Sequence, residues 1–129
     1  MMSEAEVQSR IMMEAAKHGI ILWRNNSGAF KDDTGRMVYY GLGVISKQQN
    51  SRIKSSDLIG IWPGHGYGCA EEGVGIFIAI ECKREGWKYN PNDEREQAQK
   101  AFIDFVISKG GIAGFCASTV DFLKLIGKA

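Results

Sequence analysis

One segment of the chain ends an apolar run with a carboxylate and an amine. Residues 77–80 read Phe-Ile-Ala-Ile and are followed by Glu81, Cys82 and Lys83. Because alternate side chains of a strand share a face, we expect Glu81 and Lys83 on one side and Cys82 on the other. An acid beside an ammonium group at the end of a sheet suits the binding of a cation and a phosphate in one place. The Glu-x-Lys spacing alone is a weak signal, because a solvated surface charge pair gives it as well.

A second acid, Asp57, opens the preceding apolar run, residues 58–62. If the two runs pair as an antiparallel hairpin across the glycine-rich segment 63–75, Asp57 comes to lie near Glu81. Two carboxylates can share a hard cation such as Mg²⁺, which prefers oxygen ligands and keeps several waters. A cation held there would lower the pKa of a bound water and neutralise charge on a phosphate. The arrangement therefore favours metal-assisted hydrolysis of a phosphodiester.

The hydrophobic pattern predicts the elements that must position these residues. A helix is expected over 3–17, capped by Ser3, and a stronger helix over 94–109, ended by Gly110 and Gly111. Strands are expected at 20–23, 58–62, 76–80 and 112–116, with a weak strand or hairpin around 37–40 and a last helix after Ser118. This order predicts the α/β class, with a mixed central β-sheet flanked by α-helices.

Length and charge set further bounds. The 129 residues form one domain, residues 1–129, and a net charge of +1 excludes a polycationic tail but not a basic patch. Residues 24–54 hold six basic side chains against two acidic ones, whereas residues 55–80 hold three acids and no Lys or Arg. A segment suited to phosphates thus precedes one that supplies a metal-binding acid.

Several classes of protein are disfavoured by composition. The three cysteines are scattered and form no C-x-x-C pair, so we expect neither a disulfide framework nor structural zinc, and a reducing, cytoplasmic compartment. No apolar run approaches the roughly 18 residues that span a membrane, so no membrane partner is expected. The glycine-rich segment does not have the spacing of a dinucleotide fingerprint, and we expect no small-molecule organic cofactor.

Five short segments, in order, resemble a known family. Residues 3–8 (SEAEVQ), 22–28 (LWRNNSG), 56–60 (SDLIG), 80–83 (IECK) and 99–103 (QKAFI) together look like the virus-type replication-repair nuclease (VRR-NUC) domain of the PD-(D/E)xK nuclease superfamily. The resemblance runs from Glu4 to about Leu125 and implies a restriction-endonuclease-like core and a single nuclease domain over residues 1–129. Ser56 stands where many members of the superfamily have a proline.

The resemblance implies a role for individual residues. The implied catalytic residues are Asp57, Glu81, Lys83 and Gln99. The implied metal ligands are Glu4, Asp57, Glu81 and the backbone carbonyl of Cys82, with Glu4 acting directly or through water. The implied DNA-binding residues are Arg24, Asn25, Ser27 and Lys54. Gln97 competes with Gln99, but apolar residues lie three, four and seven positions after Gln99, which puts Gln99 on the helix face directed to the sheet.

The implied function is a Mg²⁺-dependent, structure-selective DNA endonuclease in which Mn²⁺ can substitute for Mg²⁺. The implied partner is branched DNA, above all the four-way (Holliday) junction of replication and repair, cut by a homodimer in the cytoplasm of a bacterium or a phage-infected host cell. Tyr39, Tyr40 or Trp62 are candidates for the dimer interface, if they are exposed. For Trp62, packing in the core or at its rim is the other expectation. Two other readings stay open: a catalytically silent module that binds DNA structures in a replication or recombination complex, and a small α/β domain whose charges form only surface pairs.

Overall fold

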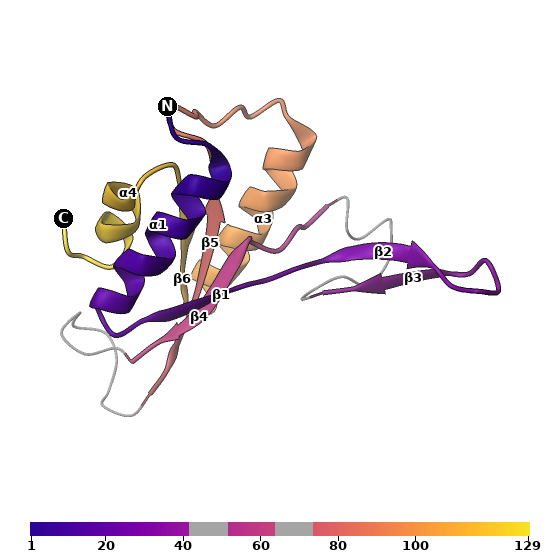
Figure 1. Ribbon diagram of the computed structural model, residues 1–129, viewed down its shortest axis with the longest axis horizontal. Helices are drawn as coiled ribbons and strands as arrows, with labels where there is room; N and C mark the ends of the chain where they lie inside the picture. Colours follow the sequence, from indigo (N-terminus) through magenta and orange to yellow (C-terminus); the bar gives the residue numbers. More distant parts are fainter. Residues whose placement is uncertain (42–51, 64–73) are drawn as a thin grey trace.

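The computed structural model describes residues 1–41, 52–63 and 74–129 (Figure 1). Its main sheet has four strands in the order β1 (Ile21–Arg24), β4 (Leu58–Trp62), β5 (Ile76–Cys82) and β6 (Ile112–Cys116). β4 runs antiparallel to β1 and β5, whereas β6 runs parallel to β5. The predicted mixed sheet is confirmed. Most of the glycine-rich segment expected as a loop lies outside the described residues.

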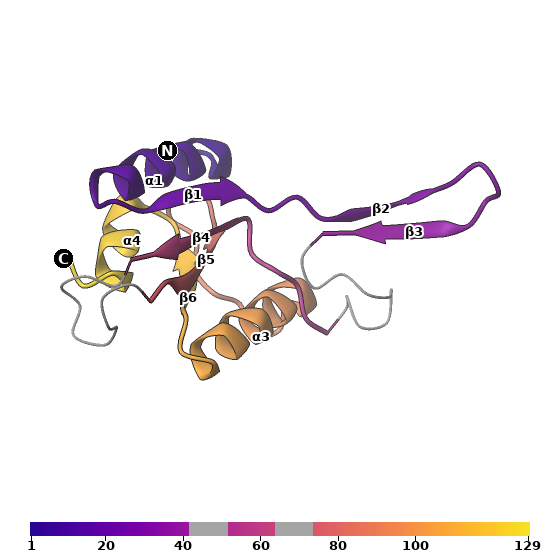
Figure 2. The same ribbon diagram turned by 90° about the horizontal axis from the view of Figure 1, so that it is seen from below.

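Helices cover both faces of this sheet. α1 (Glu4–Lys17) and α4 (Thr119–Leu125) lie together on one face, and α3 (Glu94–Ser108) lies on the other (Figure 2). The arrangement is the α/β class expected from the sequence, with a central sheet flanked by helices, as in restriction-endonuclease-like nucleases. No helix among the described residues is long and apolar enough to cross a membrane.

Each of the three helices is preceded by a polar side chain that caps its N-terminus. The Glu6 N–H donates to Ser3 Oγ at 3.2 Å, and the Asp121 N–H donates to Ser118 Oγ at 3.1 Å. The Glu96 N–H donates to Asp93 Oδ1 at 3.0 Å, a cap that starts α3. α3 is followed by Gly110 with φ of +92°, a backbone conformation that only glycine adopts without strain.

The alternation along β5 divides the core in two. Ile78, Ile80 and Cys82 are fully buried in the larger cluster, beneath α1 and α4. Ala79 belongs to the smaller cluster beneath α3. By the same alternation, the Glu81 side chain points to the sheet face that α3 covers. This is the face with the smaller apolar cluster.

One predicted interface residue is wrong. Trp62 is only 3% exposed and packs in the cluster beneath α1 and α4, so of its two expected places the core is confirmed and the interface is wrong. It shares a strand face with the fully buried Leu58, whereas its neighbour Ile61, on the opposite face, is 56% exposed. The sequence of β4 is apolar on both faces, so periodicity could not tell which end residue is covered.

The weak hairpin expected around residues 37–40 is present as a separate two-stranded sheet. β2 (Gly28–Lys31) and β3 (Met37–Tyr40) pair antiparallel and extend away from the main sheet as an arm (Figures 1 and 2). Three large apolar side chains of the arm are exposed: Phe30, Met37 and Tyr40. An isolated two-stranded sheet is only marginally stable in water, so the arm gains from any partner that covers it.

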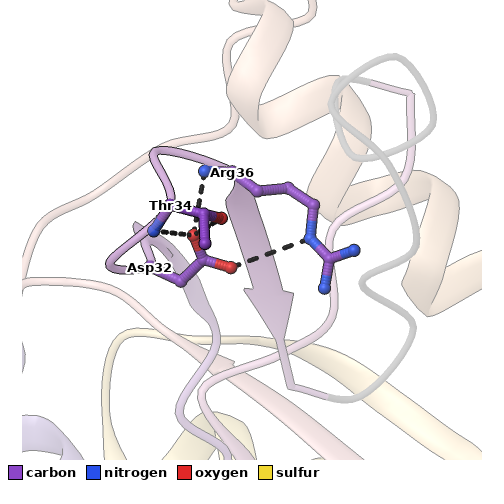
Figure 3. A network of polar contacts seen from close by, with 3 residues as sticks. All are labelled: Asp32, Thr34 and Arg36. Carbon is purple, nitrogen blue, oxygen red and sulfur yellow. Dashed lines mark hydrogen bonds and ion pairs between the residues drawn. The ribbon is translucent and has the colours of Figure 1, made fainter.

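The turn at the tip of the arm is closed by Asp32. Its Oδ1 accepts hydrogen bonds from the Thr34 hydroxyl at 2.6 Å and from the Thr34 and Arg36 N–H groups, each at 2.9 Å (Figure 3). These bonds, the Thr34 hydroxyl first, lower the pKa of Asp32 from its ordinary value. The acid at the tip therefore builds the turn.

Candidate active site

Strand register brings Asp57 and Glu81 together. Leu58 pairs with Ile80, so Asp57, one residue before β4, comes opposite Glu81 near the end of β5. The Cys82 N–H donates to Asp57 Oδ2 at 3.0 Å, which holds the Asp57 carboxylate against β5. The two acids expected from the sequence to meet across an antiparallel pair do so.

Glu81 is a buried acid with a perturbed pKa. It is 3% exposed, and its Oε1 accepts a hydrogen bond from Gln99 Nε2 at 2.9 Å. Burial, followed by the Asp57 carboxylate, raises the pKa of Glu81 from 4.5 to about 9, although Lys83 acts in the opposite direction. Without added positive charge, Glu81 therefore holds a proton at neutral pH. Burial, more than the charge of Asp57, therefore disfavours the ionised form of Glu81.

Gln99 links this acid to the predicted catalytic amine. Lys83 Nζ donates to Gln99 Oε1 at 2.8 Å, while the other end of the same amide bonds Glu81. Gln99 is 1% exposed, whereas Gln97 is exposed and bonds the Pro91 carbonyl. The prediction that Gln99 faces the sheet is confirmed. Its role in catalysis stays a prediction.

Aromatic rings surround the Lys83 ammonium. Its Nζ lies 5.5 Å from the ring centre of Trp87 and 5.8 Å from that of Phe115. Those two rings pack on each other, with centroids 4.8 Å apart. A cation over ring faces is attracted to them, so the rings restrict where the amine can go.

Asn25 has a positioning role that sequence reasoning missed. Its Nδ2 donates to Ser55 Oγ at 3.0 Å and to the Ser56 carbonyl at 2.9 Å, and its N–H donates to the Asp57 carbonyl at 2.8 Å. Three bonds thus fasten the segment that carries Asp57 to the end of β1. They depend on the pairing of residues about thirty positions apart, which no local pattern reveals.

A polar cavity of about 490 Å³ lies over the two acids. It brings together six of the residues predicted for the site: Asn25, Ser27, Lys54, Asp57, Glu81 and Gln99. Arg24 is exposed at the end of β1 and does not line it. Tyr40, at the base of the arm, and Arg95, from α3, line it without having been predicted.

Glu4 lies in a neighbouring cavity of about 570 Å³ that is also lined by Lys83, Arg84 and Arg95. The Glu4 carboxylate also contributes, as the smallest of the causes, to the raised pKa of Glu81. Within residues 1–41, 52–63 and 74–129, no three His, Cys, Asp or Glu side chains converge on one point. The part of Glu4 in metal binding stays a prediction.

The donor set fits Mg²⁺. This ion is held in proteins by one or two carboxylates, with waters and substrate phosphate completing its shell, rather than by an all-protein cage. Asp57 and Glu81 supply two carboxylates at the wall of a polar cavity, and oxygen is the ligand atom that Mg²⁺ prefers. The Cys82 thiol lies in the opposite core and burial raises its pKa, so it is not a thiolate ligand. The role of its backbone carbonyl stays a prediction.

Comparison with protein families and known proteins places the chain in a family. A family model described as the VRR-NUC domain matches residues 2–120 of the 129. No curated protein matches the chain, and no solved structure does.

We predict that Glu81→Gln flattens the pH dependence of stability in buffer without divalent ions. Between pH 4.5 and about 9, folded Glu81 holds a proton that the unfolded chain releases, so the free energy of unfolding falls as pH rises through this window. Gln cannot ionise, yet it keeps an acceptor for Gln99. Urea unfolding at several pH values measures the effect. An identical pH dependence for wild type and variant would contradict the raised pKa.

We also predict that Gln99→Ala and Gln97→Ala differ in stability. Gln99→Ala leaves Glu81 and Lys83 without their shared partner in a buried place, and should cost about 1–3 kcal/mol. Gln97→Ala, the same change at an exposed position of the same helix, removes only a solvent-exposed bond to the Pro91 carbonyl and should cost about 0.5 kcal/mol. Chemical denaturation compares them. Equal costs would show that the amide does not connect the two groups.

Proposed function

We propose how the site of this chain cuts DNA and which class of DNA it selects, on the premise that the chain belongs to the VRR-NUC domain family. Membership makes the chain a nuclease of the PD-(D/E)xK type, a hydrolase with DNA as its substrate. The proposal is a Mg²⁺-dependent endonuclease, also active with Mn²⁺, that cuts four-way junctions or related branched DNA as a homodimer. The observation that carries it is the Asp57–Glu81 pair, joined to Lys83 by Gln99.

Asp57 and Glu81 are the residues that would hold the ion, with the Cys82 carbonyl and, through water, Glu4. Once bound, Mg²⁺ would supply a water of lowered pKa and neutralise charge on the phosphate. The Cys82 N–H and the Gln99 amide each hold one of the two carboxylates in place. Glu81 must release its proton before it can bind a cation, so ion binding strengthens as pH rises.

Lys83 is the proposed electrostatic catalyst. An ammonium group has three N–H donors, and Gln99 takes one of them. In the proposal another donates to a non-bridging oxygen of the scissile phosphate and the third orients the attacking water. Charge that develops on the phosphate is then met by a donor already in position. The Trp87 and Phe115 rings keep the amine from swinging out to solvent.

DNA backbone contacts are assigned to the basic and polar side chains around the cavity. Lys54 and Ser27 line it, and Arg24 lies nearby at the end of β1. Contacts of this kind set the register of a protein on DNA and carry little sequence information. Asn25 serves the same surface indirectly, because its bonds hold the Ser55–Asp57 segment.

A second copy of this chain is the proposed cover for the arm. Phe30, Met37 and Tyr40 are 54%, 43% and 48% exposed, and Tyr40 also lines the site cavity. Self-association through the arm would therefore bury apolar surface next to the site. A two-fold axis relates two such sites in a homodimer, and that symmetry suits the paired cuts of a four-way junction.

We predict that Asp57→Asn and Lys83→Ala each lower cleavage of a labelled four-way junction in Mg²⁺ by about 10²- to 10⁴-fold. Asp57→Asn removes a carboxylate proposed to hold the ion, and Lys83→Ala removes the amine proposed to face the phosphate. Lys100→Ala is the matched control, because Lys100 is exposed on α3, pairs with Asp104 at 2.7 Å and lines neither cavity. Gel analysis of the products over a time course measures the rates.

Equal cleavage by wild type, Asp57→Asn and Lys83→Ala would overturn the assignment of the site. Faster cleavage of linear duplex than of junctions would remove the claim about branched DNA and leave the nuclease. Junction binding that persists in EDTA, with no product at any Mg²⁺ or Mn²⁺ concentration, would replace the proposal with a catalytically silent binding module.

A further inference from the structure

Arg95 is a cation that the proposed mechanism does not use. It is exposed on α3 and lines both the cavity over Asp57 and Glu81 and the neighbouring cavity that contains Lys83. In the part of the chain that the structure describes, no ion pair involves Arg95. An unpaired guanidinium at the boundary of two cavities is available for an anionic ligand.

The nearby acids of α3 are engaged elsewhere. Asp93 caps the helix by accepting the Glu96 N–H, and Glu96 Oε1 accepts the Asn90 N–H at 3.0 Å. Both carboxylates thus stabilise the start of α3. Among the described residues, neither of these carboxylates forms an ion pair with Arg95.

The position of Arg95 relative to the reacting groups follows from helix geometry. Residues four apart lie on the same helix face, with a rise of about 6 Å between them, so Arg95 stands one turn from Gln99. Gln99 contacts both Glu81 and Lys83. Arg95 is therefore one helical turn away from the residues assigned to the scissile phosphate, and it does not itself belong to that set.

We propose that the two cavities form one groove for a DNA strand, and that Arg95 holds the phosphate adjacent to the scissile one. The inference rests on the proposed function and extends it to the substrate on both sides of the cut. A guanidinium group presents paired N–H donors that match two oxygens of a phosphate, and it stays charged at all working pH values. The second cavity, which is lined by Lys83, Arg84 and Arg95 together with the acids Glu4, Asp93 and Glu96, receives the strand beyond the cut.

Arg95→Ala tests this placement by separating binding from catalysis. We expect the Kd for a labelled four-way junction in EDTA to rise about tenfold, because one charged hydrogen-bonding group is lost. The slope of log K against log salt, between about 50 and 200 mM, should fall by about 1. In Mg²⁺, KM should rise while kcat changes by less than about threefold, since the residue does not contact the reacting atoms.

Two further variants make the result specific. Arg95→Lys keeps the charge and should restore the salt slope, with part of the affinity still missing because the paired donors are lost. Lys109→Ala removes one positive charge at the far end of α3, about 21 Å along the axis, and should leave Kd and slope unchanged. Both changes are at exposed positions, and thermal unfolding checks that the fold is intact.

An unchanged Kd and salt slope for Arg95→Ala would overturn the inference. A loss of kcat at constant KM would also overturn it, because Arg95 would then act on the scissile phosphate. Failure of the proposed function gives a distinct result. In that case the wild-type protein would cut no DNA in Mg²⁺ or Mn²⁺, independently of the result for Arg95→Ala. If the wild-type protein cuts DNA but Arg95→Ala has the wild-type Kd and salt slope, the proposed nuclease activity is retained and only the proposed groove is rejected.

Discussion

The antiparallel register of β4 and β5 sets Asp57 beside Glu81, a buried acid at the wall of a polar cavity. Two carboxylates so close repel each other, and burial adds the cost of removing a charge from solvent. The raised pKa of Glu81 expresses both effects. A side chain with so perturbed a pKa, at the wall of a polar cavity, is more typical of a functional site than of a structural ion pair.

The sheet face on which this pair lies determines which other residues can reach it. α3 packs on that face, so Gln99 can reach the end of β5 and bond Glu81 and Lys83 with one amide. The apolar cluster beneath α3 is the smaller of the two, which leaves room at its end for polar groups. Asn25 fixes the remaining side by tying the Ser55–Asp57 segment to β1. Sheet, helix and loop thus hold the acids and the amine in one arrangement.

Sequence alone could predict whatever depends on local periodicity. Period-two alternation placed Glu81 and Lys83 on one face, and helical spacing selected Gln99 over Gln97. It could not decide between core and interface for Trp62, because β4 is apolar on both faces and only the packing of α1 and α4 determines which face is covered. The bonds of Asn25 and the shared position of Arg95 depend on contacts between distant elements, for which the sequence has no local signal.

The central claim is that Asp57 and Glu81 together hold a divalent cation. Crystals soaked in Mn²⁺ and measured by anomalous diffraction test it most directly, at a pH near 8 where cation binding can displace the Glu81 proton. The account predicts an anomalous peak between the two carboxylates that is absent from Asp57→Asn crystals treated in the same way. Saturating Mn²⁺ that leaves no peak there, or a peak equally strong in the variant, would contradict it.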